Sequence, residues 1–366
     1  MVSLGRLSRF RVLLGMIVYS VLVLGCDALL ETPFPANLTD LSASQNVGSL
    51  LGIRSDTQEF ELHSVLDNAG NEYLVVLRWP NRDWTGNSAE KLWIFDSTLA
   101  LVREYPRRGE EPVRVVPGDP ASDPVFFGRP VVADGAGNIV SGDLRFRLID
   151  LDAPPEQLEN LVAGGAFRPD YGLSVYPTDS LSLFGGIEGE NLLLAVYPGL
   201  ELGSLPPDPG PGPPDPGDDR IEVLLAPPEY LAGGSFFRVM GVGAFSGGFR
   251  ILLEERSSSA ERMHLFLFVD DPPPGPLLDS EGRVSAGVNG VTAEVGSARG
   301  MQLTSRGVVV DRGDGDLRRY TLEGGFAEEF RTGDRQRSVF GFTPNGRAYY
   351  RLNLVQGRLM RFRTWW

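Results

Sequence analysis

Cys26 is the residue whose type and position most clearly predict a defined chemistry. It is the only cysteine among 366 residues, and it follows an apolar run from Val12 to Leu24 that is preceded by three arginines. A positive start, an apolar stretch and a small residue before the cysteine, here Gly25, are typical of an export signal. The apolar run has about 13 residues, whereas a helix that spans a bilayer needs about 20. Residues 1–25 are therefore predicted to be a signal peptide rather than a permanent transmembrane helix.

The stretch Val23-Leu24-Gly25-Cys26 resembles the lipobox of bacterial lipoproteins. That resemblance implies cleavage before Cys26 and lipid attachment to its thiol. It further implies an exported protein held by lipid in the bacterial cell envelope, either on the periplasmic face of a membrane or on the cell surface. Several acyl chains on one residue give stable membrane binding. An ordinary cleaved signal and a buried, inert cysteine are the alternatives.

Charge and cysteine content exclude several classes of protein. The formal net charge is −14, and loss of the three signal arginines takes it to −17. A chain this acidic is a poor partner for nucleic acid. Arginines are spread through every region, which argues against an arginine-rich binding face. No second cysteine is available for a disulfide, so stability must come from a hydrophobic core.

Residues of the types used in catalysis are scarce. His63 and His264 are the only histidines, and both sit in alternating, strand-like runs that predict ordinary strand residues. Glu254 and Glu255 are adjacent, and in a strand their side chains point to opposite faces. The sequence therefore predicts no catalytic residue, no metal site and no cofactor.

One divalent metal such as calcium, serving a metal-dependent hydrolase or lactonase, is the alternative. The run Asp311 to Arg319 offers Asp311, Asp314 and Asp316, but the spacing departs from the EF-hand loop and lacks its closing glutamate. A hairpin turn explains these aspartates better.

A candidate binding loop spans residues 80–90. Trp84, beside Arg82 and Asp83, could stack on a sugar or a peptide. A tryptophan folded back onto the rim of its sheet is the alternative.

Short β-rich runs separated by Gly, Asn, Asp and Pro turns predict an all-β fold. Four segments share a turn, a glycine, a polar residue and then β-formers, at 67–76, 134–143, 279–287 and 343–352. Glycine at such a position permits the positive φ of a tight hairpin, and Asp or Asn caps the turn. The glycine markers are Gly70, Gly137, Gly189, Gly248, Gly307 and Gly346.

The order of Asp-x-x-Gly-Asn, a strand and a strand ending in an apolar residue and Asp resembles NHL-type β-propeller blades. It is carried by the segments that begin at 67 and 134. The resemblance implies a single β-propeller, and the marker spacing implies about six blades. Two β-sandwich domains are the alternative.

The predicted organisation is a signal peptide (1–25), a tether (26–55) and a propeller domain (56–366) with a proline-rich loop at 205–219. We expect the C-terminal run 357–366 to close the ring by pairing with a strand near 59–66, anchored by Trp365 and Trp366.

These patterns predict a lipid-anchored cell-envelope binding or scaffolding protein, with an envelope protein or a glycan as partner. The alternatives are the metal-dependent hydrolase and a surface adhesin. A hydrolase should gather at least three carboxylate or amide oxygens around the channel axis, whereas a scaffold should line the channel with small or apolar side chains.

Overall fold

A computed structural model describes a defined set of residues of this chain. These residues are 39–53, 59–67, 69–80, 89–107, 127–134, 136–158, 171–175, 181–188, 191–198, 221–225, 236–245, 248–256, 261–268, 289–296, 298–313, 316–331 and 337–364.

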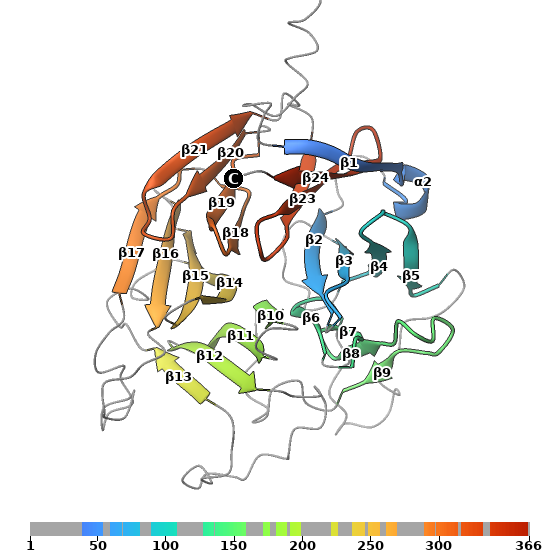
Figure 1. Cartoon of the computed structure of the whole chain (residues 1–366), viewed down its shortest axis with the longest axis horizontal. Helices are drawn as coiled ribbons and strands as arrows, with labels where there is room; N and C mark the ends of the chain where they lie inside the picture. Colours follow the sequence, from blue (N-terminus) through green and yellow to red (C-terminus); the bar gives the residue numbers. More distant parts are fainter. Residues whose placement is uncertain are drawn as a thin grey trace, which may run out of the picture.

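The described strands form six four-stranded antiparallel sheets arranged around a central axis (Figure 1). The first sheet along the chain contains β2 (Glu59–Leu66), β3 (Glu72–Trp79), β4 (Lys91–Asp96) and β5 (Leu101–Tyr105). The second contains β6 (Val131–Ala133), β7 (Ile139–Ser141), β8 (Leu144–Phe146) and β9 (Glu156–Gln157). The third contains β10 (Tyr171–Val175), β11 (Leu181–Glu188), β12 (Asn191–Pro198) and β13 (Ile221–Leu225).

The remaining sheets continue around the axis. The fourth contains β14 (Phe236–Phe245), β15 (Gly248–Arg256), β16 (Glu261–Phe268) and β17 (Asn289–Glu294). The fifth contains β18 (Gly300–Thr304), β19 (Gly307–Asp311), β20 (Asp316–Tyr320) and β21 (Phe326–Arg331). The last contains β22 (Ser338–Phe342), β23 (Ala348–Asn353), β24 (Arg358–Thr364) and β1 (Thr39–Asn46), and the one-turn helix α2 (Gly48–Leu51) follows β1.

The innermost strands β2, β6, β10, β14, β18 and β22 make the ring continuous. Each contacts the innermost strands of both neighbouring sheets. This arrangement is a β-propeller, so the all-β propeller prediction is confirmed. The alternative of two β-sandwich domains is wrong, because sandwiches would pack sheets in face-to-face pairs rather than around one axis.

Continuous apolar runs form the middle strands because each sheet is covered on both faces. In β3, Leu74 and Val76 belong to one core cluster, shared with the last sheet and α2. Val75 and Leu77 belong to another, shared with the second sheet. Since successive side chains alternate in direction, one strand supplies both cores.

The predicted turns are confirmed where the structure describes them. Asp67 Oδ1 accepts hydrogen bonds from the backbone N–H groups of Ala69 and Asn71, at 2.9 and 2.7 Å. Gly70 has φ +80°, and its N–H donates to the Asp67 carbonyl. The same arrangement recurs at Asp134, Gly137 and Asn138.

Ring closure differs from the prediction. β24 pairs with β1, from Thr39↔Thr364 to Asn46↔Arg358, and not with the region 59–66. β2 is instead the innermost strand of the first sheet, and its Leu62 lies against Gly341 of β22 so closely that a Cβ on Gly341 would meet Leu62 Cβ at 2.6 Å. Trp365 and Trp366 lie outside the described residues.

The predicted tether is therefore too long. Residues 39–53 belong to the propeller, because β1 completes the last sheet and Val47 and Leu51 are fully buried in its core. The propeller begins at residue 39 at the latest, rather than at residue 56. The proline-rich segment 205–219 lies outside the described residues, between the paired strands β12 and β13.

Candidate functional site

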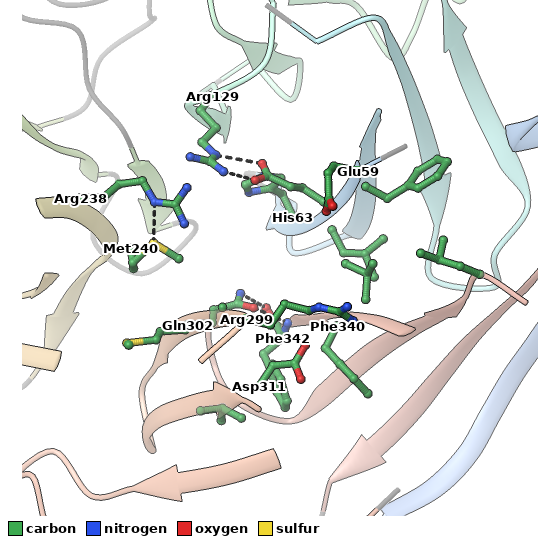
Figure 2. Close-up of a pocket in the computed structure, with 18 of the residues that line it drawn as sticks. Glu59, His63, Arg129, Arg238, Met240, Arg299, Gln302, Asp311, Phe340 and Phe342 are labelled. Carbon is green, nitrogen blue, oxygen red and sulfur yellow. Dashed lines mark hydrogen bonds and ion pairs between the residues drawn. The ribbon is translucent and has the colours of Figure 1, made fainter. Parts of the chain in front are cut away.

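A pocket with a volume of about 140 Å³ opens between the innermost strands (Figure 2). Its walls come from four sheets through β2, β14, β18 and β22, and from a fifth through Arg129, which precedes β6. The charged and polar lining residues are Glu59, Glu61, His63, Arg129, Arg238, Arg299, Gln302, Asp311 and Arg337. The pocket therefore joins segments that are far apart in the sequence.

The alternating sequence of β2 explains how its polar residues reach the pocket. Phe60 and Leu62 are 4% and 5% exposed and pack in the core shared with the last sheet. The intervening residues Glu59, Glu61 and His63 point the other way, and they are only partly buried. A strand with this pattern has one face in the core and one toward the pocket.

Glu61 and Arg129 form a bidentate ion pair across the boundary between the first two sheets. Arg129 Nε donates to Glu61 Oε2 at 2.8 Å, and Arg129 Nη2 donates to Glu61 Oε1. The guanidinium carbon also lies 5.7 Å from the centre of the Trp79 ring. This planar, two-bond pairing suits arginine and fixes both side chains.

His63 is neutral at pH 7. Burial, and secondarily the positive charge of Arg238, lowers the pKa of His63 from 6.5 to about 4. Its Nε2 lies 3.2 Å from Glu61 Oε2. Because a carboxylate can only accept, Nε2 carries the proton and Nδ1 keeps a lone pair. Figure 2 shows Arg238 facing His63 and Arg129 across the pocket.

Two of the remaining arginines also have carboxylate partners. Arg337 Nη2 lies 3.4 Å from Glu59 Oε1. Arg238 Nη2 lies 3.4 Å from Oε2 of Glu254, which is fully buried on β15. These charges are balanced locally, as buried charges must be.

Arg299 differs from these three. Its hydrogen bond from Nη1 goes to the backbone carbonyl of Ser338, at 3.4 Å. Within the described residues, no carboxylate lies at ion-pair distance from this guanidinium. Asp311 also lines the pocket, and its Oδ1 accepts from the N–H of Gly313 at 2.8 Å.

Gln302 serves the ring rather than the pocket. Its Nε2 donates to the Phe342 carbonyl at 2.6 Å, and its Oε1 accepts from the Phe342 N–H at 2.7 Å. The side-chain amide thus satisfies both backbone groups of Phe342, which links β18 to β22.

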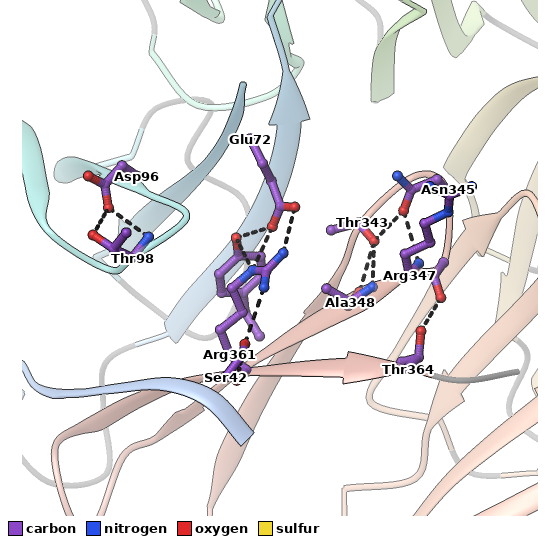
Figure 3. A network of polar contacts seen from close by, with 12 residues as sticks. Ser42, Glu72, Asp96, Thr98, Thr343, Asn345, Arg347, Ala348, Arg361 and Thr364 are labelled. Atoms are coloured by element: carbon purple, nitrogen blue, oxygen red, sulfur yellow. Dashed lines mark hydrogen bonds and ion pairs between the residues drawn. The ribbon is translucent and has the colours of Figure 1, made fainter. Parts of the chain in front are cut away.

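A second charged cluster, here called the closure cluster, joins the first sheet to the last (Figure 3). Arg361 donates through Nε and Nη2 to Glu72 at 3.1 and 2.9 Å, and through Nη1 to Ser42 Oγ at 3.2 Å. Tyr350 Oη donates to Glu72 Oε1. Burial and the neighbouring Glu72 charge raise the pKa of Tyr350, and the hydrogen bond to Glu72 raises the pKa of Arg361. Every charge in this cluster has a partner.

The channel fits neither of the two expectations for its lining. It contains carboxylates, but Glu59 and Glu61 face arginines, and the Gln302 amide is held by backbone. It also contains charged groups that a purely apolar lining would lack. In the described part of the chain, no three His, Cys, Asp or Glu residues are grouped so that they could hold a metal ion.

The sequence-predicted site residues lie outside the described residues. These are the lipid-attachment site Cys26 and the candidate binding loop with Arg82, Asp83 and Trp84. The described segments contain no helix with the length and apolarity needed to cross a bilayer.

Other residues singled out in the sequence have structural partners. Glu254 pairs with Arg256 at 2.8 Å, and Glu255 Oε2 lies 2.7 Å from Nε2 of the buried His264. The two glutamates thus use separate partners, as their adjacency on a strand predicts. Asp311 lines the pocket, and its turn to Gly313 is a hairpin turn as expected.

The arginines of the pocket were not predicted from the sequence. Their spread along the chain argues against an arginine-rich binding face, yet four arginines from different sheets line the pocket. In a propeller every innermost strand contributes to the same channel, so residues spread over the whole chain converge there. The usable signal was a charged residue at or just before four of the innermost strands, at Glu59, Arg129, Arg299 and Arg337.

Comparisons with known proteins identify no family. No protein-family model matches the chain, and no curated protein is similar to it. Among solved structures, the β-propeller domain of Cps50 (Swd1) from Myceliophteria thermophila has 9% identity and a TM-score of 0.41, over 89% of this chain and 100% of that one. BamB from Moraxella catarrhalis has 9% identity and a TM-score of 0.38, over 89% and 98% of the two chains. Hydrazine synthase from Kuenenia stuttgartiensis has 8% identity and a TM-score of 0.41, over 83% and 95%. Likenesses this distant carry no argument about ligand or partner, and the propeller assignment rests on the sheet order of this chain itself.

Proposed function

We propose that this protein is a lipid-anchored binding protein of the bacterial cell envelope, whose ligand enters the central pocket. The observation that carries the binding role is the convergence of charged side chains from separate sheets on one pocket. A purely structural ring has no need for charged groups at its centre, because burying them is costly. The pocket is therefore the feature of the described propeller best suited to recognition.

The anchoring part of the proposal rests on the sequence around Cys26. Twelve residues separate Cys26 from Thr39, the first residue of β1. A fully extended chain between these two residues spans at most about 45 Å. The propeller would thus stay close to the membrane surface.

Membrane fractionation of Cys26→Ala tests the anchor. We expect the wild-type chain to sediment with membranes and to incorporate labelled palmitate, and the variant to lose both properties. Ser20→Ala, a small change in the same segment, is the matched control and should behave as wild type. A Cys26→Ala chain that stays palmitate-labelled and membrane-bound would remove the lipid anchor from the proposal.

A further inference from the structure

Arg299 is the pocket residue with the most capacity for a ligand. Arg129 and Arg337 face Glu61 and Glu59, and Arg238 faces Glu254. The Arg299 guanidinium has a 3.4 Å hydrogen bond to a carbonyl and no carboxylate at ion-pair distance among the described residues. A guanidinium has five N–H donors in a planar fork. Arg299 is exposed and lines the pocket.

The sign of the lining favours an anion. Four arginines and three carboxylates line the pocket, and Glu254, which pairs with Arg238 from behind the lining, is shared with Arg256, while the whole chain carries −14. Asp311 is the carboxylate that opposes an anion here, and one of its oxygens is engaged by the Gly313 N–H. Arginine matches the two oxygens of a carboxylate with two parallel hydrogen bonds.

The size and apolar part of the pocket favour an organic ligand. The volume of about 140 Å³ is close to that of a protein cavity that accommodates benzene, about 150 Å³. Apolar side chains contribute much of the wall, namely Met301, Val309, Val339, Phe340 and Leu354. An inorganic anion would leave these surfaces in contact with water, whereas a ring or short chain would cover them.

His63 supplies one further recognition element. Its Nε2–H is directed to Glu61, so Nδ1 presents a lone pair. A neutral imidazole nitrogen accepts a hydrogen bond without repelling an anion. A hydroxyl or amino group on the ligand would pair with it.

We infer that the central pocket binds a small organic carboxylate, with the carboxylate on Arg299 and an apolar body of about one six-membered ring against the apolar wall. This inference rests on the proposed binding function and adds the chemical class of the ligand. The anchor at Cys26 is independent of it.

Fluorine NMR with 4-fluorobenzoate tests the inference on the full-length protein in detergent micelles at pH 7, against micelles without protein. We expect saturable line broadening with the wild-type chain. Arg299→Gln should weaken binding about tenfold or more, because a hydrogen bond to a charged group contributes about 1.5–3 kcal/mol. Arg363→Gln, the same charge change at an exposed arginine of β24, is the matched control and should bind as wild type.

Four results would overturn the inference. They are absence of broadening with the wild-type chain, equal binding by Arg299→Gln, equal binding of the neutral 4-fluorobenzyl alcohol, and displacement of the probe by inorganic phosphate at equal concentration. Each concerns the ligand class alone, whereas loss of the anchor is read from membrane fractionation. Failure of the inferred ligand class and failure of the proposed lipid anchor are therefore distinguishable.

Discussion

Arg361 is partly buried and Arg299 is exposed, and each reaches from one sheet to the next. Arg361 makes two hydrogen bonds to Glu72 and one to Ser42, and so connects β24 to β3 and β1. Arg299 has a weak bond to a backbone carbonyl and no carboxylate partner among the described residues. A guanidinium whose donors are satisfied holds two sheets together. One whose donors are largely unused can accept a ligand.

This difference predicts that damage to the closure cluster affects stability, whereas damage to the pocket affects binding. The strongest disruption is deletion of residues 40–45, which removes most of β1 from the last sheet. We expect a loss of more than about 5 kcal/mol, comparable to the whole stability of many domains. Urea unfolding followed by tryptophan fluorescence measures it.

Deletion of residues 206–217 is the control, since it removes no described strand and should leave the unfolding midpoint nearly unchanged. If both deletions lower the midpoint equally, pairing of β1 with β24 does not close the ring.

Arg361→Met is the next largest change. It leaves the Glu72 carboxylate, whose side chain is 14% exposed, without its cation, and removing one partner of a buried ion pair costs about 3 kcal/mol. Arg358→Met, at an exposed position of the same strand that donates to Ser44 Oγ, should change stability by less than about 0.5 kcal/mol. Equal effects of the two variants in thermal unfolding would show that the closure cluster adds no more stability than an exposed arginine of the same strand.

His63 predicts a pH dependence of stability that originates in the pocket. Its pKa is about 4 in the folded chain and 6.5 in the unfolded one, so between these values the unfolded chain binds the extra proton. Stability therefore falls as pH drops below 6.5, by about 2 kcal/mol at pH 5. The charged groups that face His63 are Glu61, Arg129 and Arg238. They are the same in the wild-type chain and in a variant that replaces only His63.

Replacing the imidazole isolates this contribution. In His63→Gln the unfolding free energy should vary less between pH 7 and pH 5 than in wild type, by about 2 kcal/mol. Identical slopes in urea titrations would mean that His63 is protonated in the folded chain.

Arg299→Met should have the smallest effect on stability, within about 1 kcal/mol. The substitution removes a charge that lacks a carboxylate partner among the described residues and keeps a similar apolar length. Differential scanning fluorimetry alongside Arg361→Met gives the comparison directly. A loss as large as that of Arg361→Met would make Arg299 a structural residue.

The sequence predicted the propeller because its signals are local. The turn at Asp67 to Asn71 and the apolar run of β3 are each specified within ten residues, and both appear as expected. The closing strand could not be predicted in the same way. β1 reads "TDLSASQN", which is mostly polar, because it is an outer strand and its pairing with β24 comes from a partner more than 300 residues away.

The candidate site could not be predicted from the sequence for a related reason. Glu61 and Arg129 are separated by 68 positions, and Arg299 and Ser338 by 39. Only the ring brings them to one pocket. The glycine repeat also marks different places in different sheets. Gly70, Gly137 and Gly346 follow the innermost strand of their sheets, whereas Gly189 falls after the second strand, between β11 and β12.

Ligand-induced stabilisation tests the central contrast most directly. Melting temperatures of the wild-type chain, Arg361→Met and Arg299→Met are measured with and without saturating benzoate, since a ligand that binds only the folded chain raises its stability. We expect benzoate to raise the melting temperature of the wild type and of Arg361→Met by similar amounts, and to leave Arg299→Met unchanged. Equal stabilisation of all three chains, or stabilisation lost in Arg361→Met but kept in Arg299→Met, would contradict the account.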